Sequence, residues 1–478
     1  MVRAGTVIVL VCMAMSACKP SDILTVPPPT GVQPLSDYQS QTGAELLEAG
    51  GVTQMSAGFA QGGFNGVLEW SGQLSDEFSW NDFTYDGAYA NVDARMTAAV
   101  AGFEEAGDTP LANLLAARVT LMTAIGLLKQ YEPPTGRAKI GLAYALIGYT
   151  ELLAAEDYCA GLPLSTLTTT GAVYGTPLTT DSLLGAAQVQ FDSALTYANN
   201  DGTVLPLASV GYARTLLNRG NFAAADTVLH NVPTSFVYNA ELQPGGYNNG
   251  GLTISDVYDY YRQYYPCSNI NGTSGKGQNG LNYTTANDPR LVFDTTVGET
   301  CDGYYGGQAD SVWYYPIKFG LISTGVPLAT GVEARLIEAE VALHAGAVGT
   351  WMSELNTLRT AGNMGGTYIP ITGTIPMLQA DSTTSAPATE QVDVMFRERA
   401  FWLYGTGMRL GDMRRLIRQY GRDQSTVFPV GPFPNGNAPT LPAPIPNYGT
   451  DVNLTLPTAG SHLTDPNAAY KGCTSKAA

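Results

Sequence analysis

Residues 396–416 read FRERAFWLYGTGMRLGDMRRL and concentrate cations in a chain that is otherwise poor in them. Five arginines stand here beside Glu398 and Asp412, whereas only 14% of the 478 residues are charged. Arginine side chains on a helix can pair with buried carboxylates and can donate to the free carbonyl groups at helix C-termini. We therefore predict that residues 396–416 lock helix pairs together as part of the scaffold and do not bind ligand.

Apolar residues recur at three- and four-residue spacing, with alanine at close-packing positions, over much of the chain. This spacing predicts helices, of which the first ends at Pro133-Pro134 and the third is capped by Asp181. Helix pairs with glycine-containing turns resemble tetratricopeptide repeats, most clearly over residues 207–229. An irregular all-α domain is the alternative and predicts much the same core. The predicted helices cover residues 111–130, 138–155, 181–198, 207–218, 222–229, 332–345, 351–360 and 392–418.

The composition excludes several classes of protein. The chain has 41 acidic and 24 basic side chains, so its net charge of −17 would repel nucleic acid. Gly, Pro, Asn and Tyr dominate residues 232–331, and residues 362–386 and 427–478 are similarly loop-like. Since a hundred residues of this kind do not form one structureless loop, we predict short strands, turns and binding loops inserted into the scaffold. The fold class is therefore mostly α, with tetratricopeptide-like helix pairs and an irregular binding face of loops and short strands.

The N-terminus carries the features of an export signal. Arg3 precedes the apolar run 7–15, and Ser16-Ala17 places small residues before Cys18, as at a bacterial lipoprotein cleavage site. Met15 departs from the usual branched aliphatic residue, and an ordinary secretory signal with a chance cysteine is the alternative. We predict a signal peptide over 1–17, lipidation of Cys18, a proline-containing tether over 18–34 and a single helical domain over 35–478. The protein is thus expected to be lipid-anchored and not membrane-spanning.

Four cysteines remain after Cys12 in the signal and Cys18 at the anchor are set aside. In an oxidising compartment four cysteines allow three pairings. Cys267 and Cys301 bracket a Gly/Asn/Tyr-rich segment, which favours pairing them with each other and Cys159 with Cys473. The second bridge would pin the C-terminal tail to the core.

No arrangement of residues predicts catalysis, a cofactor or a metal site. Residues 272–277 (GTSGKG) imitate a phosphate-binding loop, but they lack its first glycine and its Ser/Thr after Lys276. Asp76-Glu77 and Glu156-Asp157 are adjacent carboxylate pairs, whereas glycoside hydrolysis needs two carboxyls that face each other from different elements. The histidines are far apart, and His344 is predicted to be a core or helix-end residue.

Two aromatic clusters form the predicted ligand site. Aromatic faces can stack on sugar rings while amide and carboxylate groups bind the hydroxyls, although tyrosines also pack in this way in ordinary loop-rich proteins. One wall is predicted from residues 79–86 and the other from residues 304–315. The ligand-binding candidates are Trp80, Asn81, Asp82 and Tyr85, with Tyr304, Tyr305 and Trp313 opposite.

Residues 396–416 also closely resemble the signature of the SusD/RagB family of outer-membrane nutrient-binding lipoproteins. The family run E-R-x-x-E-L-x-x-E-G-x-R-x-x-D-L-R-R is matched at Glu398, Arg399, Leu403, Gly407, Arg409, Asp412, Arg414 and Arg415. Trp402 and Thr406 stand at its two later acidic positions. Shorter fragments agree in order, at Ser75-Asp76-Glu77, Asp288-Pro289-Arg290, 315–319 and 334–340, while the usual P-I-P-x-x-E ending is reduced to Pro444-Ile445-Pro446.

The resemblance implies a non-enzymatic lipoprotein exposed on the outer membrane. Such a protein would bind a nutrient, usually a glycan or oligosaccharide, and act as a lid on a TonB-dependent β-barrel transporter. A lid for peptides, a secreted glycosidase and a structural helical-repeat adaptor in the periplasm are the alternatives.

Overall fold

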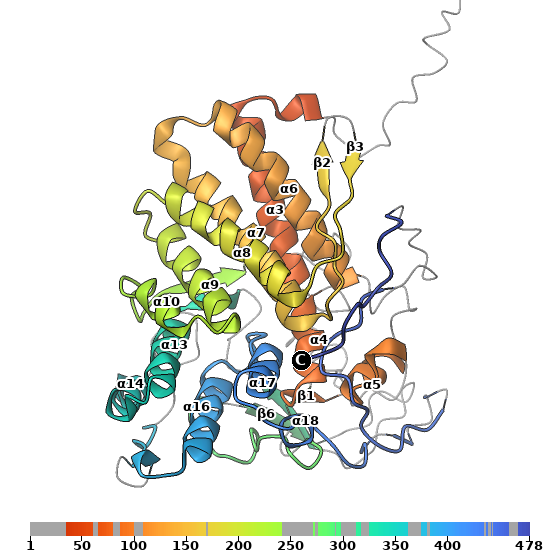
Figure 1. Cartoon of the computed structure of the whole chain (residues 1–478), viewed down its shortest axis with the longest axis vertical. Coiled ribbons are helices and arrows are strands. Elements are labelled where there is room, and N and C mark those ends of the chain that lie inside the picture. Colours follow the sequence, from red (N-terminus) through yellow and green to blue (C-terminus); the bar gives the residue numbers. More distant parts are fainter. Residues whose placement is uncertain are drawn as a thin grey trace, which may run out of the picture.

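A computed structural model places the helices and short strands of the chain, and Figure 1 shows their arrangement. The structure describes residues 35–60, 66–79, 87–99, 109–168, 171–240, 271–272, 276–291, 293–297, 312–316, 325–361, 374–379, 383–434, 436–437, 441, 443–457 and 467–478. The predicted signal peptide, lipidation site and tether lie outside these residues, as do Cys267 and Cys301.

The N-terminal half is a layer of helices in which neighbours in sequence pack side by side, as the tetratricopeptide-like pattern predicted. Small residues bring the helices close together. A side chain on Gly148 or Gly211 would collide with the ring of Phe191, which the two glycines hold between them. The layer contains η1 (Leu35–Tyr38), α3 (Gln41–Ala60), α6 (Thr109–Tyr131), η3 (Pro134–Gly136), α7 (Arg137–Asp157), α8 (Thr180–Tyr197), α9 (Val204–Asn218) and α10 (Phe222–Thr227).

Helices α6 and α7 are long and apolar enough to cross a membrane, judged by length and composition alone. Both pack as core helices of this layer, because 50% and 78% of their most apolar windows are buried. Arg118 of α6 also donates to Glu151 of α7 at 2.6 Å in the buried interface between them.

A second group of helices forms the other end of the molecule. It meets the first through α13, which contacts α9 and α10, and also through α17 and α4, which contact α7. His344 ends α13, exposed and stacked on Phe222, which confirms the prediction of a helix-end histidine. This group contains α4 (Val67–Leu74), α5 (Gly87–Asp93), η2 (Thr97–Ala99), α13 (Gly331–His344), α14 (Val348–Ala361), α16 (Ala388–Trp402), α17 (Arg409–Arg418) and α18 (Gln424–Val427).

The described strands form four two-stranded antiparallel sheets. Hence the predicted fold class, mostly α with short strands, is confirmed. The pairs are β1 (Phe78–Ser79) with β5 (Asn271–Gly272), β2 (Thr166–Thr168) with β3 (Gly171–Val173), β4 (Val237–Ala240) with β8 (Val326–Thr330), and β6 (Phe293–Val297) with β7 (Val312–Pro316).

Three details of the predicted helices are wrong. The helix predicted over 392–418 is two helices, α16 and α17, because Gly405 and Gly407 adopt φ values of +70° and +74° in the link between them. The cap of α8 is Thr179, whose hydroxyl accepts from Ser182 N at 3.1 Å, and Asp181 lies inside the helix. Helices α3, α4, α5 and α18 were not predicted; in α3, Gly51 and Gly58 let the backbone approach Leu121 and Leu114 of α6.

Cys159 and Cys473 form a disulfide with their Cα atoms 5.6 Å apart, which confirms the predicted pairing. Backbone hydrogen bonds on either side of it, Ala160 N to Ser475 O at 3.0 Å and Thr474 N to Ala160 O at 2.7 Å, hold the C-terminal tail against the end of α7. The tail is therefore pinned to the core as expected.

Candidate functional site

The elements that carry the two predicted walls of the ligand site lie next to each other. Strand β1 pairs with β5, β5 contacts β7, and β7 pairs with β6. Trp80, Asn81, Asp82 and Tyr85 follow β1 in the chain, and Tyr304 and Tyr305 lie between β6 and β7; these six are outside the described residues. Trp313 lies in β7 with its backbone opposite Thr296, and its side chain is also outside the description.

Ser75, Asp76 and Glu77 are buried and lie directly before strand β1; we call them the SDE corner. Arg409 of α17 donates to both oxygens of Asp76, at 2.6 and 3.0 Å, and Leu281 N donates to Oδ2 at 3.0 Å. Burial acts to raise the pKa of the Asp76 carboxyl, but Arg409 and these hydrogen bonds outweigh it and lower the pKa below its usual value. Asp76 is thus an ionised structural carboxylate.

Residues at the break between α16 and α17 form hydrogen bonds with the SDE corner. Gly405 N donates to Glu77 Oε1 at 3.1 Å, and the hydroxyl of Tyr404 donates to Glu77 O at 3.1 Å. A continuous helix would bond the Gly405 N–H within itself, so the link must unwind to reach Glu77. The arrangement places the start of β1 at a defined position against the helical scaffold.

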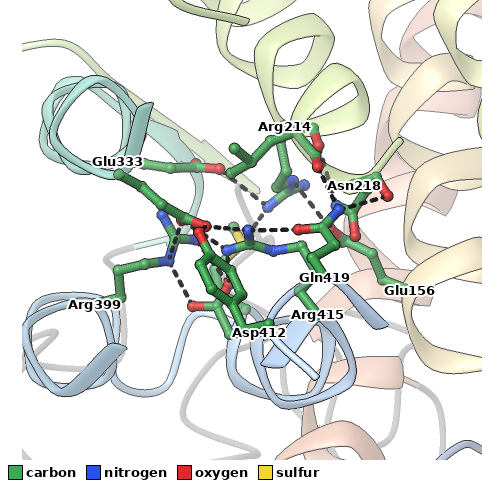
Figure 2. A network of polar contacts seen from close by, with 12 residues as sticks. Glu156, Arg214, Asn218, Glu333, Arg399, Asp412, Arg415 and Gln419 are labelled. Carbon is green, nitrogen blue, oxygen red and sulfur yellow. Dashed lines mark hydrogen bonds and ion pairs between the residues drawn. The ribbon is translucent and has the colours of Figure 1, made fainter. Parts of the chain in front are cut away.

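Arginines of the 396–416 segment form a buried network at the junction of the two helix groups. Figure 2 shows Arg399 of α16 and Arg415 of α17 there, near Arg214 of α9 and Glu333 of α13. Asp412 accepts from Arg399 at 2.7 and 2.9 Å and from Arg415 at 2.8 Å. Arg415 also pairs with Glu340 of α13. The prediction that these residues lock helices together is confirmed.

Arg414 confirms the second part of that prediction, the capping of a helix C-terminus. Its Nη1 donates to the carbonyls of Ala155 at 2.9 Å, Tyr158 at 3.3 Å and also Glu156, at the end of α7. These carbonyls have no partner inside the helix, and they carry the negative end of its dipole.

The shorter fragment Asp288-Pro289-Arg290 joins the same scaffold. Arg290 Nη2 donates to Asp288 at 2.7 Å, and its Nη1 donates to Glu398 of α16 at 2.9 Å. Arg359 of α14 binds the same Glu398, with Nε donating at 2.9 Å. Segments far apart in the sequence are therefore joined through buried charges.

Neither adjacent carboxylate pair is open to a substrate. Asp76, Glu77 and Asp157 are at most 1% exposed, and Glu156 is 5% exposed. Asp76 is held by Arg409, and Glu156 accepts from Asn218 at 2.7 Å. Their observed roles are structural.

At the junction, two carboxyl groups are buried without enough hydrogen bonds or opposite charges to offset their loss of hydration. Glu333 lies 3.5 Å from Arg214, and burial raises its pKa to about 7. Neither side-chain oxygen of Asp157 accepts a hydrogen bond within the described residues; burial and then Glu156 raise its pKa well above the usual value. Both groups bind protons more tightly in the folded protein than in the unfolded chain.

We expect the free energy of unfolding to fall as pH rises from 5 to 8. A carboxyl with a raised folded-state pKa stabilises the protein below its unfolded pKa, and that stability is lost as pH passes through the folded value. For Glu333 the ionised form costs up to about 3 kcal/mol at pH 8. Urea unfolding of the wild type and of Glu333→Gln at pH 5 and pH 8 measures the change in free energy of unfolding. Between these pH values the variant should lose less stability than the wild type.

The matched control is Glu390→Gln, which alters an exposed glutamate in the first turn of α16. It should show the pH dependence of the wild type. Equal pH dependence in all three proteins would contradict the assignment to Glu333.

The geometry defines the protein first as a class: a helical-repeat scaffold, locked by buried arginines, that carries short two-stranded sheets. Two solved proteins of Bacteroides vulgatus have a similar fold. A SusD superfamily protein has 14% identity, a TM-score of 0.55 and coverage of 81% of this chain and 90% of its own. A SusD-like carbohydrate-binding protein has 15% identity, a TM-score of 0.50 and coverage of 78% and 83%.

A SusD-like carbohydrate-binding protein of Bacteroides fragilis has 12% identity and a TM-score of 0.54, over 92% of this chain and 95% of its own. No family model and no curated protein matches the sequence. The chain therefore has the SusD-like fold, as the resemblance at residues 396–416 implied.

Proposed function

We propose that the protein is a non-enzymatic outer-membrane lipoprotein that binds oligosaccharide and delivers it to a TonB-dependent β-barrel transporter. The observation that carries the proposal is the SusD-like fold, shared with two solved proteins that are named as carbohydrate-binding. The neighbouring placement of β1, β5 and β7 supports a single site built from both aromatic clusters. The burial of both adjacent carboxylate pairs supports binding without hydrolysis.

An oligosaccharide array with the purified protein tests the cargo. We expect binding to at least one neutral oligosaccharide and no release of reducing sugar from it. A blank oligosaccharide array together with binding to a peptide array would replace the cargo by peptides. Release of reducing sugar that a single carboxylate substitution abolishes would establish a glycosidase instead.

Trp80→Ala and Trp313→Ala are each expected to weaken binding of the best array oligosaccharide about two- to twelvefold. Loss of an aromatic stacking contact costs about 0.5–1.5 kcal/mol. Isothermal titration calorimetry measures the affinity, and the melting temperature should not fall. The control is Tyr174→Ala, which removes an exposed aromatic next to β3. Unchanged affinity in both tryptophan variants would show that the site is wrong.

The anchor and the transporter are tested in cells of the source bacterium. Cys18→Ser should abolish incorporation of a labelled fatty acid and release the protein from the membrane fraction. Protease added to intact cells should digest the wild-type protein, since a lid on an outer-membrane transporter faces outward. Pull-down of the lipidated protein should recover a large β-barrel protein; a protease-resistant protein without such a partner would favour the periplasmic adaptor.

A further inference from the structure

Lys276 is a lone cation in an unusual place. It is the only charged residue between Arg262 and Asp288, and it stands in the 272–277 segment that imitates a phosphate loop. The structure buries it to 4% exposure. A buried ammonium is costly unless its donors are bonded and its charge is balanced, so the residues that surround it indicate what it does.

The ammonium of Lys276 is bonded entirely within the protein. Its Nζ donates to Ser75 O at 2.8 Å, to Phe78 O at 2.9 Å and to Gln73 O. It also forms an ion pair with Asp93 Oδ1 at 2.5 Å, with both side chains 1% exposed. An ammonium has three donors, and these contacts leave none for a phosphate.

The partners of Lys276 lie on the elements that precede and follow one segment of the chain. The three carbonyls belong to the end of α4, the SDE corner and β1, and Asp93 is the last residue of α5. Residues 80–86, the first predicted wall, connect β1 to α5. The contacts of one ammonium therefore tie β1, which precedes that segment, to the far end of α5, the helix that follows it.

Lys276 is itself held in place. Gly280 N donates to Lys276 O at 2.9 Å, and Gln278 N donates to Val430 O at 3.1 Å. Gly277 has φ +60°, and a side chain on it would come within 2.9 Å of Val430 N. The turn is thus seated on the C-terminal part of the chain, which gives the ammonium a fixed position.

We propose that Lys276 is the positioning residue of the ligand site, holding β1 to the last residue of α5 and so fixing the two elements that the first wall connects. The inference rests on the proposed function for the identity of that wall. The tie itself consists of contacts between described residues, and it can be measured without ligand.

Hydrogen exchange of the ligand-free protein tests the tie. In Lys276→Met and in Asp93→Asn, peptides that span residues 78–93 should exchange at least about tenfold faster, since a lost charge-assisted hydrogen bond weakens local structure by that factor or more. Peptides from α6 and α7 should be unchanged. Lys129→Met, which alters an exposed lysine of α6, is the matched control. Unchanged exchange over 78–93 in folded variants would overturn the inference.

Asp93→Asn keeps the experiment decisive if Lys276→Met does not fold, because it leaves Lys276 on the three carbonyls and removes only the negative charge from the tie to α5. Both variants should also bind the best array oligosaccharide at least tenfold more weakly. Faster exchange with unchanged affinity would overturn the inference while leaving Trp313→Ala to test the proposed function. If the wild type binds no array oligosaccharide, the proposed function fails. The exchange result alone still decides whether Lys276 ties β1 to α5.

Discussion

Arg415→Met is expected to lower the free energy of unfolding by about 3–5 kcal/mol, the usual loss when one partner of a buried ion pair is removed. Arg415 Nη2 donates to Glu340 at 2.9 Å and to Asp412 at 2.8 Å, and all three side chains are buried. Methionine fills part of the space, but it leaves two carboxylates in the junction with one cation fewer. Glu340 would keep the Tyr420 hydroxyl at 2.7 Å and a guanidinium 3.7 Å away. Urea denaturation followed by circular dichroism measures the loss.

The same substitution at an exposed pair is the control. Arg422 donates to Asp393 at 2.6 Å, but the side chain of Asp393 is 65% exposed. Arg422→Met should therefore cost no more than about 0.5–1 kcal/mol. Arg415→Lys should lie between wild type and Arg415→Met, because lysine keeps the charge and loses the two-pronged geometry. Equal losses for Arg415→Met and Arg422→Met would show that the junction network does not stabilise the fold.

Replacing Cys159 and Cys473 together by serine is expected to cost about 2–5 kcal/mol. The bridge joins residues separated by 314 positions, so it removes a large part of the freedom of the unfolded chain. It also sits beside the backbone, with Leu456 N 3.4 Å from both sulfur atoms. Thermal unfolding of the double variant beside the wild type measures the change.

Limited proteolysis locates the effect of the missing bridge. In the double variant the chain should be cut first within the last residues of the tail, since Thr474 and Ser475 then depend on their hydrogen bonds to Ala160 alone at this point. The Cys159→Ser and Cys473→Ser single variants should match the double variant in stability. A double variant as stable as the wild type would contradict the prediction.

Local pattern accounts for the parts of this fold that could be predicted. Apolar spacing and alanine content predicted α6, α7, α8, α9 and α13 close to their observed bounds, because helix formation depends on residues three and four apart. The roles of Arg414 and Arg415 were also predictable. In a chain with few cations, arginines clustered in an apolar helical segment must find carboxylates or carbonyls inside the protein.

Non-local contacts account for the parts that were missed. Helix α3 is stable because its glycines allow close approach to α6, and this gain exists only once α6 is beside it. The break between α16 and α17 forms because Glu77, more than 300 residues earlier, accepts from Gly405. Neither partner can be identified from the local sequence.

The sequence by itself determined the helical class and the internal role of the 396–416 arginines, because these follow from local spacing and from the cost of burying charge. For the cysteines it left three pairings possible and only favoured Cys159–Cys473, which the structure then showed. Only the tertiary structure decided which carboxylate meets which arginine and that Lys276 spans the carbonyls of Ser75 and Phe78 and the carboxylate of Asp93. The physical reason is that a buried charge must be compensated by some partner, and the meeting of elements far apart in the chain selects that partner.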